Sequence, residues 1–245
     1  MAGPQHLAAA RRPQRRPGAI CLGAIALALA GCGGSSRTYE SDPQALLREA
    51  KAAVDGSGAL HFKLASDGAT ATGSTIVIKD GEGDAKRPDG FTGSFDVVRS
   101  GFALSLKVVS TGGTFYVQLP FTTGFARTDP SSYGFTDPGR LISPDVGLSS
   151  LLSSTHSASL GDRDRLGGEE LYELDVTLPG QKVKDLLTSA DPAPDVKGRI
   201  GINVDSHQVR RVVLTGPFFE KGKDATFTLM LTDYGESVSV TPPAA

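Results

Sequence analysis

Alternation of apolar and polar residues, repeated along most of the chain, constrains the fold more than any other feature. A period of two places every second side chain on the same face of a strand, so each such stretch predicts a half-buried β-strand. The apolar positions are Leu60, Phe62 and Leu64; Phe102, Leu104, Leu106 and Val108; Phe115, Val117 and Leu119; Ile200, Ile202 and Val204; Val209, Val212 and Leu214; Phe227, Leu229 and Leu231; and Val238 and Val240.

Glycine-rich dipeptides between these stretches indicate how the strands connect. Asp80-Gly81-Glu82-Gly83, Asp89-Gly90 and Gly112-Gly113 are typical of tight turns, and they predict that consecutive strands pair antiparallel in a meander. Residues 157–166 and 170–178 flank Gly167-Gly168 and predict a further hairpin.

Helices are expected where a cap residue precedes a proline, because proline is tolerated at the first position of a helix. Asp42-Pro43 predicts a helix that ends near Gly56, and Asp137-Pro138 and Ser143-Pro144 predict two short helices. Another short helix is expected over residues 183–187. The predicted fold class is α+β: one large antiparallel sheet with the helices on one face.

A long connection between residues 120 and 140 interrupts the strands. It is rich in proline and glycine and contains Phe121, Phe125, Tyr133 and Phe135. Long connections in compact domains are often functional. These aromatic side chains are either packed locally or offered to a membrane interface, where amphipathic rings are favoured; in a ligand-binding domain they would lie at the mouth of the site.

The N-terminal residues have the order of a secretory signal peptide. Four arginines at 11, 12, 15 and 16 precede the apolar run Gly18–Ala30, and no acidic residue lies among them. The run of thirteen residues is shorter than the ~20 that a membrane-spanning helix needs. A segment that is cleaved after export by the Sec route is therefore favoured over a permanent span.

The cleavage region, Leu29-Ala30-Gly31-Cys32, resembles the lipobox of bacterial lipoproteins. That resemblance implies a diacylglyceryl group on the thiol of Cys32 and cleavage before it. The alternative is an ordinary signal with an incidental cysteine, but Gly33-Gly34-Ser35-Ser36 is typical of a flexible tether. We expect residues 1–31 to be the signal peptide, 32–41 the acylated cysteine and tether, and 42–245 a domain held at the extracytoplasmic face of the cell membrane.

Charge and cysteine content restrict the possible partners. Removing residues 1–31 takes away four arginines and no acid, which leaves 21 basic against 27 acidic residues and a net charge of −6. Nucleic acid is therefore not expected as a partner. Because Cys21 leaves with the signal and Cys32 is acylated, no disulfide is expected.

The sequence contains no recognisable catalytic or metal-binding motif. The histidines are not spaced as metal ligands, and neither a nucleophile elbow nor a nucleotide-binding loop is present, so neither enzymatic activity nor a cofactor or metal is expected. The spacing of Asp80, Glu82 and Asp84 faintly resembles a calcium loop, but a hairpin tip explains it better. A catalytic cluster assembled from distant residues stays open as an alternative.

Several segments resemble the mycobacterial LppX/LprA/LprF/LprG family of lipoproteins. They include SGALHFKLAS, TFYVQL, LISPDVGLSSLLSS, HSASLGDRDRLGGEELYELDVTL and PGQKVKDLL. The resemblance implies a strongly curved antiparallel half-barrel whose helices enclose a hydrophobic cavity. It further implies that acylated lipids or glycolipids are bound there and moved across the envelope, with an unidentified envelope transporter as a possible partner.

Periodicity rather than a family motif nominates the residues of such a cavity. The candidates are the apolar positions of the central strands and of the segment expected to cover them: Leu104, Leu106, Val108, Val117, Leu119, Ile142, Val146, Leu148, Leu151 and Leu152. The same positions would also form an ordinary packed core. A non-carrier scaffold or sensory lipoprotein, or an envelope hydrolase, are the competing functions.

Overall fold

The computed structural model describes residues 39–69, 73 and 75–244. Residues 39–245 form one compact unit. The elements, in chain order, are α1 (Pro43–Gly56), β1 (Ala59–Asp67), β2 (Ile76–Lys86), β3 (Gly90–Arg99), β4 (Phe102–Thr111), β5 (Thr114–Gln118), β6 (Ala126–Arg127), the 3-10 turns η1 (Pro130–Tyr133) and η2 (Pro138–Arg140), α2 (Leu148–Ser153), β7 (Ser157–Leu160), β8 (Asp164–Leu166), β9 (Glu169–Leu178), α3 (Gly180–Lys184), β10 (Val196–Asn203), β11 (Val209–Glu220) and β12 (Lys223–Thr232).

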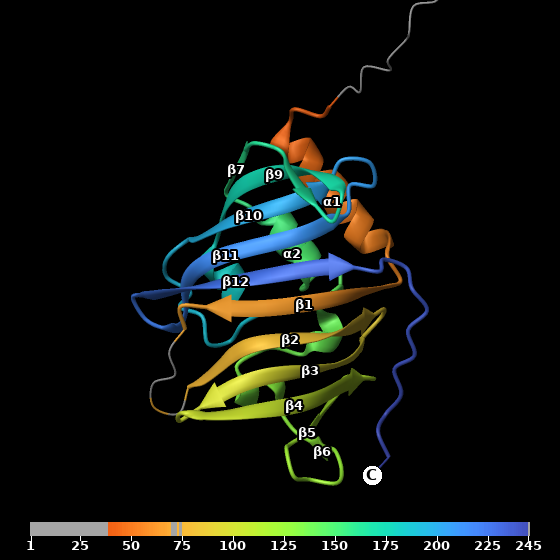
Figure 1. Cartoon of the computed structure of the whole chain (residues 1–245), viewed down its shortest axis with the longest axis vertical. Helices are drawn as coiled ribbons and strands as arrows, with labels where there is room; N and C mark the ends of the chain where they lie inside the picture. The colour runs from red at the N-terminus through yellow and green to blue at the C-terminus, as the bar shows by residue number, and fades with distance from the viewer. Residues whose placement is uncertain (1–38, 70–72, 74, 245) are drawn as a thin grey trace, which may run out of the picture. The chain divides into compact units, whose positions relative to one another are not determined.

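Within these residues, twelve antiparallel strands form one curved open sheet (Figure 1). The strand order is β6-β5-β4-β3-β2-β1-β12-β11-β10-β9-β7, with β8 pairing to β9. Two meanders thus meet where β1 pairs with β12. The predicted α+β class with a single antiparallel sheet is confirmed, as is the hairpin around Gly167-Gly168.

Strand β1 shows how the alternation gives the sheet two different faces. Leu60 and Phe62 are buried in the core, whereas His61 and Lys63 lie on the opposite, outer face. There His61 Nδ1 lies 2.8 Å from Asp84 Oδ1 of β2, and Lys63 pairs with Glu82. The inner face supplies the hydrophobic burial, while the outer pairs are partly exposed and contribute little to stability.

Glycines bring β2 and β3 unusually close together. Gly83 and Gly93 are direct cross-strand partners, and a Cβ on Gly93 would lie 2.4 Å from the carbonyl oxygen of Glu82. The predicted turn at Asp80–Gly83 is therefore wrong: these residues lie inside β2. The glycines serve close backbone and ring approach, since a Cβ on Gly81 would lie 2.3 Å from the ring of Phe95. Asp80, Glu82 and Asp84 accordingly lie along a strand and not at a hairpin tip.

This close approach predicts a stability defect for Gly93→Ala. The added Cβ meets backbone atoms, so the strands must separate, and overpacking of this kind typically costs about 1–3 kcal/mol. Urea unfolding of the variant measures the cost. Gly124→Ala is the matched control, because nothing lies within 4 Å of a Cβ at Gly124; equal stability of the two variants would contradict the steric argument.

The helices lie on the inner face of the sheet. α1 starts as predicted, with Asp42 accepting from Gln44 N at the cap, and it packs its buried side against α2 and β7. η2 begins at Asp137-Pro138 as expected. The second predicted start, Ser143-Pro144, is wrong: this segment forms turns, and α2 begins only at Leu148. Gly147 lies between the turn segment and α2. The backbone packs so closely there that a Cβ on Gly147 would lie 2.0 Å from the carbonyl oxygen of Leu141.

The C-terminal segment does not form the strand expected at Val238 and Val240. After β12 the chain leaves the sheet at Asp233, and residues 236–244 run without strand structure along one side of the molecule (Figure 1). Alternation alone misled the prediction here because the valines lie half-buried against the surface, with no neighbouring strand to pair with. Among the described residues no helix is both long and apolar enough to cross a membrane.

Candidate functional site: a hydrophobic cavity

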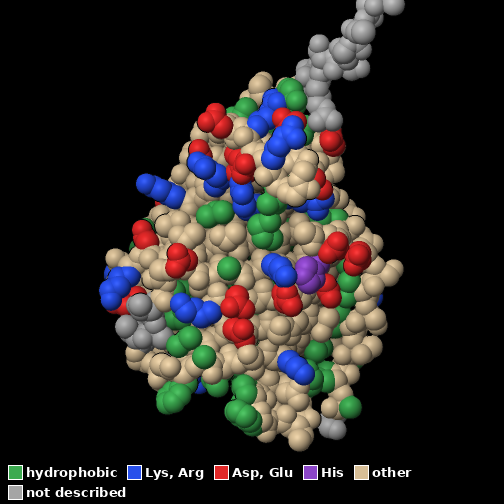
Figure 2. Space-filling view, in the orientation of Figure 1, with side chains coloured by type: hydrophobic (Ala, Val, Ile, Leu, Met, Phe, Trp, Pro, Cys, Tyr) green, Lys and Arg blue, Asp and Glu red, His purple; other side chains and the backbone are tan. Residues whose placement is uncertain are grey.

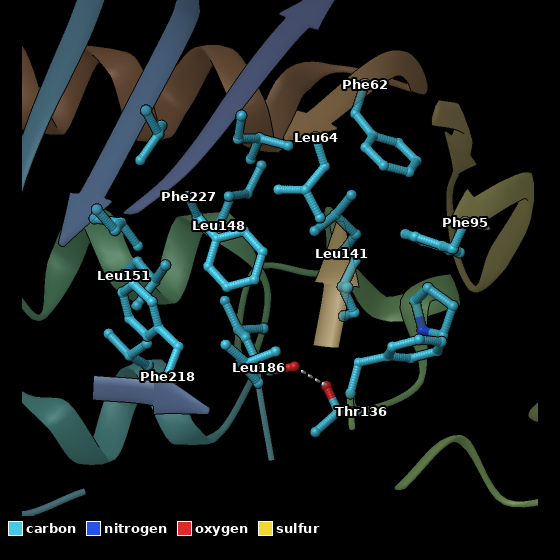
Figure 3. A pocket seen from close by; sticks show the side chains of 18 of the residues that line it. Phe62, Leu64, Phe95, Thr136, Leu141, Leu148, Leu151, Leu186, Phe218 and Phe227 are labelled. Carbon is cyan, nitrogen blue, oxygen red and sulfur yellow. Dashed lines mark hydrogen bonds between the residues drawn. The ribbon is translucent and has the colours of Figure 1, made fainter. Parts of the chain in front are cut away.

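A cavity of about 170 Å³ lies between the inner face of the sheet and the segments that cover it (Figure 3). Nearly all of its lining is apolar. The sheet contributes Phe62, Leu64, Ile78, Phe91, Phe95, Val212, Leu214, Phe218, Phe227 and Leu229, and the covering segments contribute Phe135, Thr136, Asp137, Pro138, Leu141, Leu148, Leu151, Val183, Leu186 and Leu187.

The sheet side of the cavity is formed where the two meanders meet. β1 and β12 provide Leu64 and Leu229, which line the cavity and are partly buried where they pack against the core. At one end, the rings of Phe91 and Phe95 stack with centroids 5.9 Å apart, and at the other end Phe218 packs on Phe227 at 5.2 Å. The wall therefore combines aliphatic and aromatic surface with no charged side chain from the sheet.

The cover consists of two pieces, residues 135–152 and residues 180–187. The backbone N and side-chain Oγ1 of Thr136 both donate to the carbonyl oxygen of Leu186, at 3.2 and 3.3 Å, which joins the two pieces. The fully buried Ser110 of β4 donates to Asp137, whose carboxylate also caps η2 through Gly139 N. These hydrogen bonds join the two pieces of the cover to each other and to β4. The helices of the cover are only one to two turns long.

A buried polar contact ties the cover to α1. Ser149 of α2 is fully buried and donates a hydrogen bond to Asp55. The carboxylate of Asp55 also accepts from Lys51, and its Oδ1 lies 3.5 Å from Arg87 Nη2. Burial raises the pKa of Asp55, but the hydrogen bonds and neighbouring cations outweigh it, so this pKa lies below its ordinary value. The ionised Asp55 therefore fixes one end of the cover at neutral pH.

The structure distributes the predicted cavity residues over several places. Leu148 and Leu151 line the cavity. Leu106, Val108, Val117, Ile142 and Leu152 are buried in the surrounding core, Leu104 and Val146 are half-buried, and Leu119 is exposed. As contacts to a bound lipid, all ten stay predictions.

The four aromatic residues predicted for the mouth of the site lie in different environments. Phe135 is buried, lines the cavity, and packs on Phe95 with ring centroids 5.2 Å apart. Tyr133 packs half-buried against Phe115 at 6.3 Å. Phe125 is half-buried and Phe121 is fully exposed. Sequence reasoning missed the contribution of β1, β2, β3, β11 and β12, although the alternation in β1, β11 and β12 was visible in the sequence.

The sequence model of the LppX_LprAFG lipoprotein family matches residues 42–240. The chain belongs to this family. It is 27% identical over 233 residues to a protein of Mycolicibacterium smegmatis named lipoarabinomannan carrier protein LprG, with 91% of this chain and 94% of the relative covered. The protein of the same name from Mycobacterium tuberculosis is 24% identical, with 95% and 98% covered.

Solved structures of this family share the fold. LprF from Mycobacterium bovis superimposes with a TM-score of 0.65 at 15% identity, covering 84% of this chain and 99% of LprF. LppX from Mycobacterium tuberculosis gives a TM-score of 0.58 at 18% identity, covering 82% and 100%. The recognised family and the curved antiparallel sheet expected from it are thereby confirmed.

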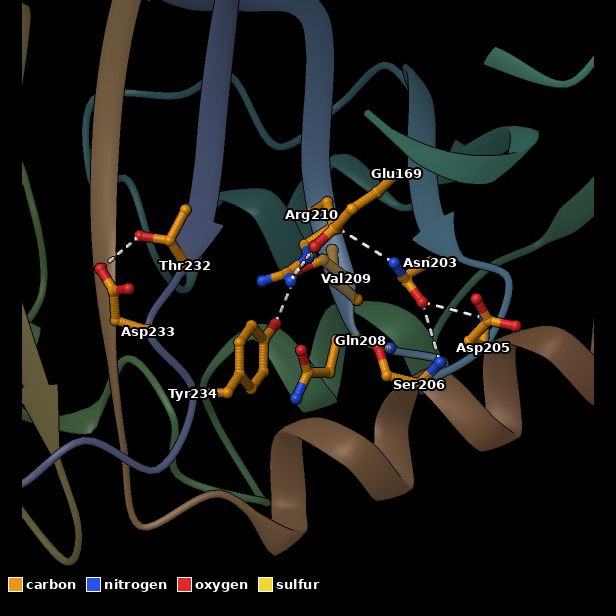
Figure 4. Close-up of polar contacts among 10 residues, drawn as sticks. All are labelled: Glu169, Asn203, Asp205, Ser206, Gln208, Val209, Arg210, Thr232, Asp233 and Tyr234. Atoms are coloured by element: carbon orange, nitrogen blue, oxygen red, sulfur yellow. Dashed lines mark hydrogen bonds and ion pairs between the residues drawn. The ribbon is translucent and has the colours of Figure 1, made fainter. Parts of the chain in front are cut away.

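A second hollow, at one end of β9, β11 and β12, has a mixed lining of apolar and polar residues. Figure 4 shows the polar contacts at and around it. Arg210 donates twice to Glu169, at 2.6 and 2.7 Å, and Asn203 donates to the same carboxylate. Hydrogen bonding by Arg210 lowers the pKa of Glu169. Tyr234 donates to the carbonyl oxygen of Val209 at 2.7 Å. Because these groups satisfy one another, the cluster stabilises the strand ends and offers few free polar groups to a ligand.

Glu173 of β9 is a largely buried acid on the outer face of the sheet. Its Oε1 accepts from Arg211 at 2.8 Å, which also pairs with Asp164, while its Oε2 has no hydrogen-bond partner. Burial raises the pKa of Glu173 and the positive charge of Arg211 opposes this rise without cancelling it. The described residues contain no group of three or more His, Cys, Asp or Glu arranged to hold a metal ion.

Glu173 predicts a specific pH dependence of stability. A raised pKa means that the folded state binds the proton more tightly, so the stability that this group contributes is lost as the pH rises from 4.5 through the folded pKa. We expect Glu173→Gln to gain stability relative to the native chain as the pH rises. Urea unfolding from pH 4 to 8 measures the difference; a difference that stays constant or shrinks would show that Glu173 titrates normally.

Proposed function

We propose that this chain is a membrane-anchored carrier that binds an acylated lipid or glycolipid in the cavity and moves it across the cell envelope without catalysing a reaction. The apolar lining is the observation that carries the proposal, because acyl chains bind through buried hydrophobic surface. The names of the two LprG relatives support a glycolipid with acyl chains as the ligand class. An envelope transporter as partner is part of the same proposal.

The size of the cavity supports a cover that moves. Ligand sites usually measure roughly 300–1,000 Å³, whereas this cavity measures about 170 Å³. The two cover pieces must therefore shift outward when a whole acyl chain enters. Such opening would separate the two pieces at the Thr136 contacts with Leu186, and it would also break the contact of Asp137 with Ser110 of β4.

A transfer assay between vesicles tests the proposal. Residues 39–245 are mixed with donor vesicles that contain a fluorescent diacyl glycolipid and with unlabelled acceptor vesicles. The initial transfer rate is expected to rise in proportion to protein concentration, because each protein molecule carries lipid through water. A rate equal to that of vesicles alone, with correctly folded protein, would favour a scaffold or sensory lipoprotein instead.

A further inference from the structure

Three apolar side chains are exposed at one edge of the sheet, on β4 and in the connection between β5 and β6. Phe121 is 105% exposed, Phe102 73% and Leu119 41%. Figure 2 shows hydrophobic side chains protruding at the lower edge of the molecule, where Figure 1 places β4–β6. We call Phe102, Leu119 and Phe121, with the cations described below, the aromatic edge.

The backbone at Phe121 gives independent evidence that this exposure has a use. Thr122 N donates to the carbonyl oxygen of Leu119, which closes a four-residue turn with Pro120 and Phe121 in the centre. Phe121 has φ = 67°, a left-handed conformation that glycine or asparagine adopts at much lower cost. A phenylalanine that is both fully exposed and strained does not stabilise the fold, so a contact outside the chain is indicated.

Hydrogen bonds hold this turn in place. Gln118 Nε2 donates to the carbonyl oxygen of Thr122, and Thr122 Oγ1 donates to that of Leu119 at 2.8 Å. Phe102 is presented similarly, because it follows the tight turn of Ser100 and Gly101, both of which have positive φ. The rings are thus displayed on ordered turns at the ends of strands.

Three exposed cations lie on the strands at this edge of the sheet, and one of them, Arg99, is directly opposite Phe102. Arg99 is the cross-strand partner of Phe102, Lys107 pairs with Gln118 next to Leu119, and Arg127 of β6 pairs with Tyr116. Within the described part of the chain, none of the three cations forms an ion pair. The acid closest to Arg127 in sequence, Asp129, accepts from Ser131 N and caps η1.

We infer that the aromatic edge docks onto the surface of an anionic lipid bilayer. Aromatic rings flanked by basic side chains match the apolar boundary and the negative headgroups of such a surface. A stable protein interface buries about 1,200–2,000 Å² in total, which three separate side chains cannot provide. The aromatic edge lies at one end of the strand order. Tyr39, the first described residue, packs on Tyr172 of β9 near the other end of the strand order.

Vesicle co-sedimentation of residues 39–245 tests this inference, and because no carried lipid is involved, its outcome is separate from that of the transfer assay. We expect binding to phosphatidylglycerol-rich vesicles that weakens with salt. The double variant Phe102→Ser/Phe121→Ser is expected to lower the partition coefficient at least about tenfold, and neutralising Arg99, Lys107 and Arg127 to glutamine by a similar factor. Leu160→Ser is the matched control, since Leu160 is 41% exposed at the other edge of the sheet.

Phe121→Gly separates docking from folding. Glycine relieves the strained φ, so the melting temperature should stay equal or rise while vesicle binding falls. Unchanged binding in Phe121→Gly and in the double serine variant, or no binding of the native domain to anionic vesicles, overturns the inference. Self-association that the double serine variant loses, without vesicle binding, would instead assign the edge to a second copy of the chain.

Discussion

Val212→Trp is expected to remove bound lipid while leaving the domain close to its native stability. Val212 lies on β11, lines the cavity and pairs with Leu229 across the strand. The indole can enter the cavity of about 170 Å³, where it fills the volume that an acyl chain would use. The overpacking that usually costs about 1–3 kcal/mol is thereby avoided. Thermal unfolding and lipid content measured on the same preparation give both results.

Val117→Trp is the matched variant for this experiment. Val117 lies on β5, is buried, and does not line the cavity. The new ring has no free volume, so we expect lower stability with lipid still bound. If Val117→Trp instead kept its stability and lost lipid, the sequence-based choice of Val117 as a lipid contact would be right, and the cavity of the loaded protein would extend beneath β4 and β5.

Cys32→Ala is expected to abolish acylation completely. Cys32 lies outside the described residues, so this prediction rests on the lipobox sequence and on the membership of a lipoprotein family. Without the thiol no diacylglyceryl group can attach, and two acyl chains are what give stable anchoring. Labelled palmitate should enter the native chain and not the variant, and the precursor should remain uncleaved.

Cys21 provides the internal control for that experiment. It is the other cysteine of the chain and lies within the apolar run of the expected signal peptide. Cys21→Ala should therefore incorporate palmitate like the native chain. Equal labelling of native and Cys32→Ala protein would contradict the lipobox assignment. Loss of label in Cys21→Ala alone would show that Cys21 is the acylated residue.

Strands such as β1, β5 and β12 could be predicted from the sequence because their apolar residues alternate with polar ones, whereas β2 and β3 were not predicted. In β1 the apolar residues Leu60, Phe62 and Leu64 follow a period of two, and in β12 Phe227, Leu229 and Leu231 do the same. Turn prediction worked at Gly112-Gly113, where both residues have positive φ. It failed at Gly81 and Gly83, because glycine also permits close packing inside a sheet, and one sequence does not separate these two uses.

The cavity itself could not be located from periodicity. A residue that faces a cavity and one that faces a neighbouring side chain occupy the same position in the pattern, as Leu229 and Leu106 do. Whether a sheet residue lines the cavity depends on where the cover lies over the sheet, and the cover is held together by contacts such as that between Thr136 and Leu186. Fifty residues separate these last two, and neither belongs to a local motif.

Mass spectrometry of lipid extracted from the purified domain tests the central claim most directly. Residues 39–245, prepared without a tag or the acylated cysteine, should retain a lipid with acyl chains at close to one molecule per protein. Val212→Trp purified in parallel should retain much less. A native domain that carries no acyl lipid and takes up none when incubated with diacyl glycolipid micelles would contradict the carrier function.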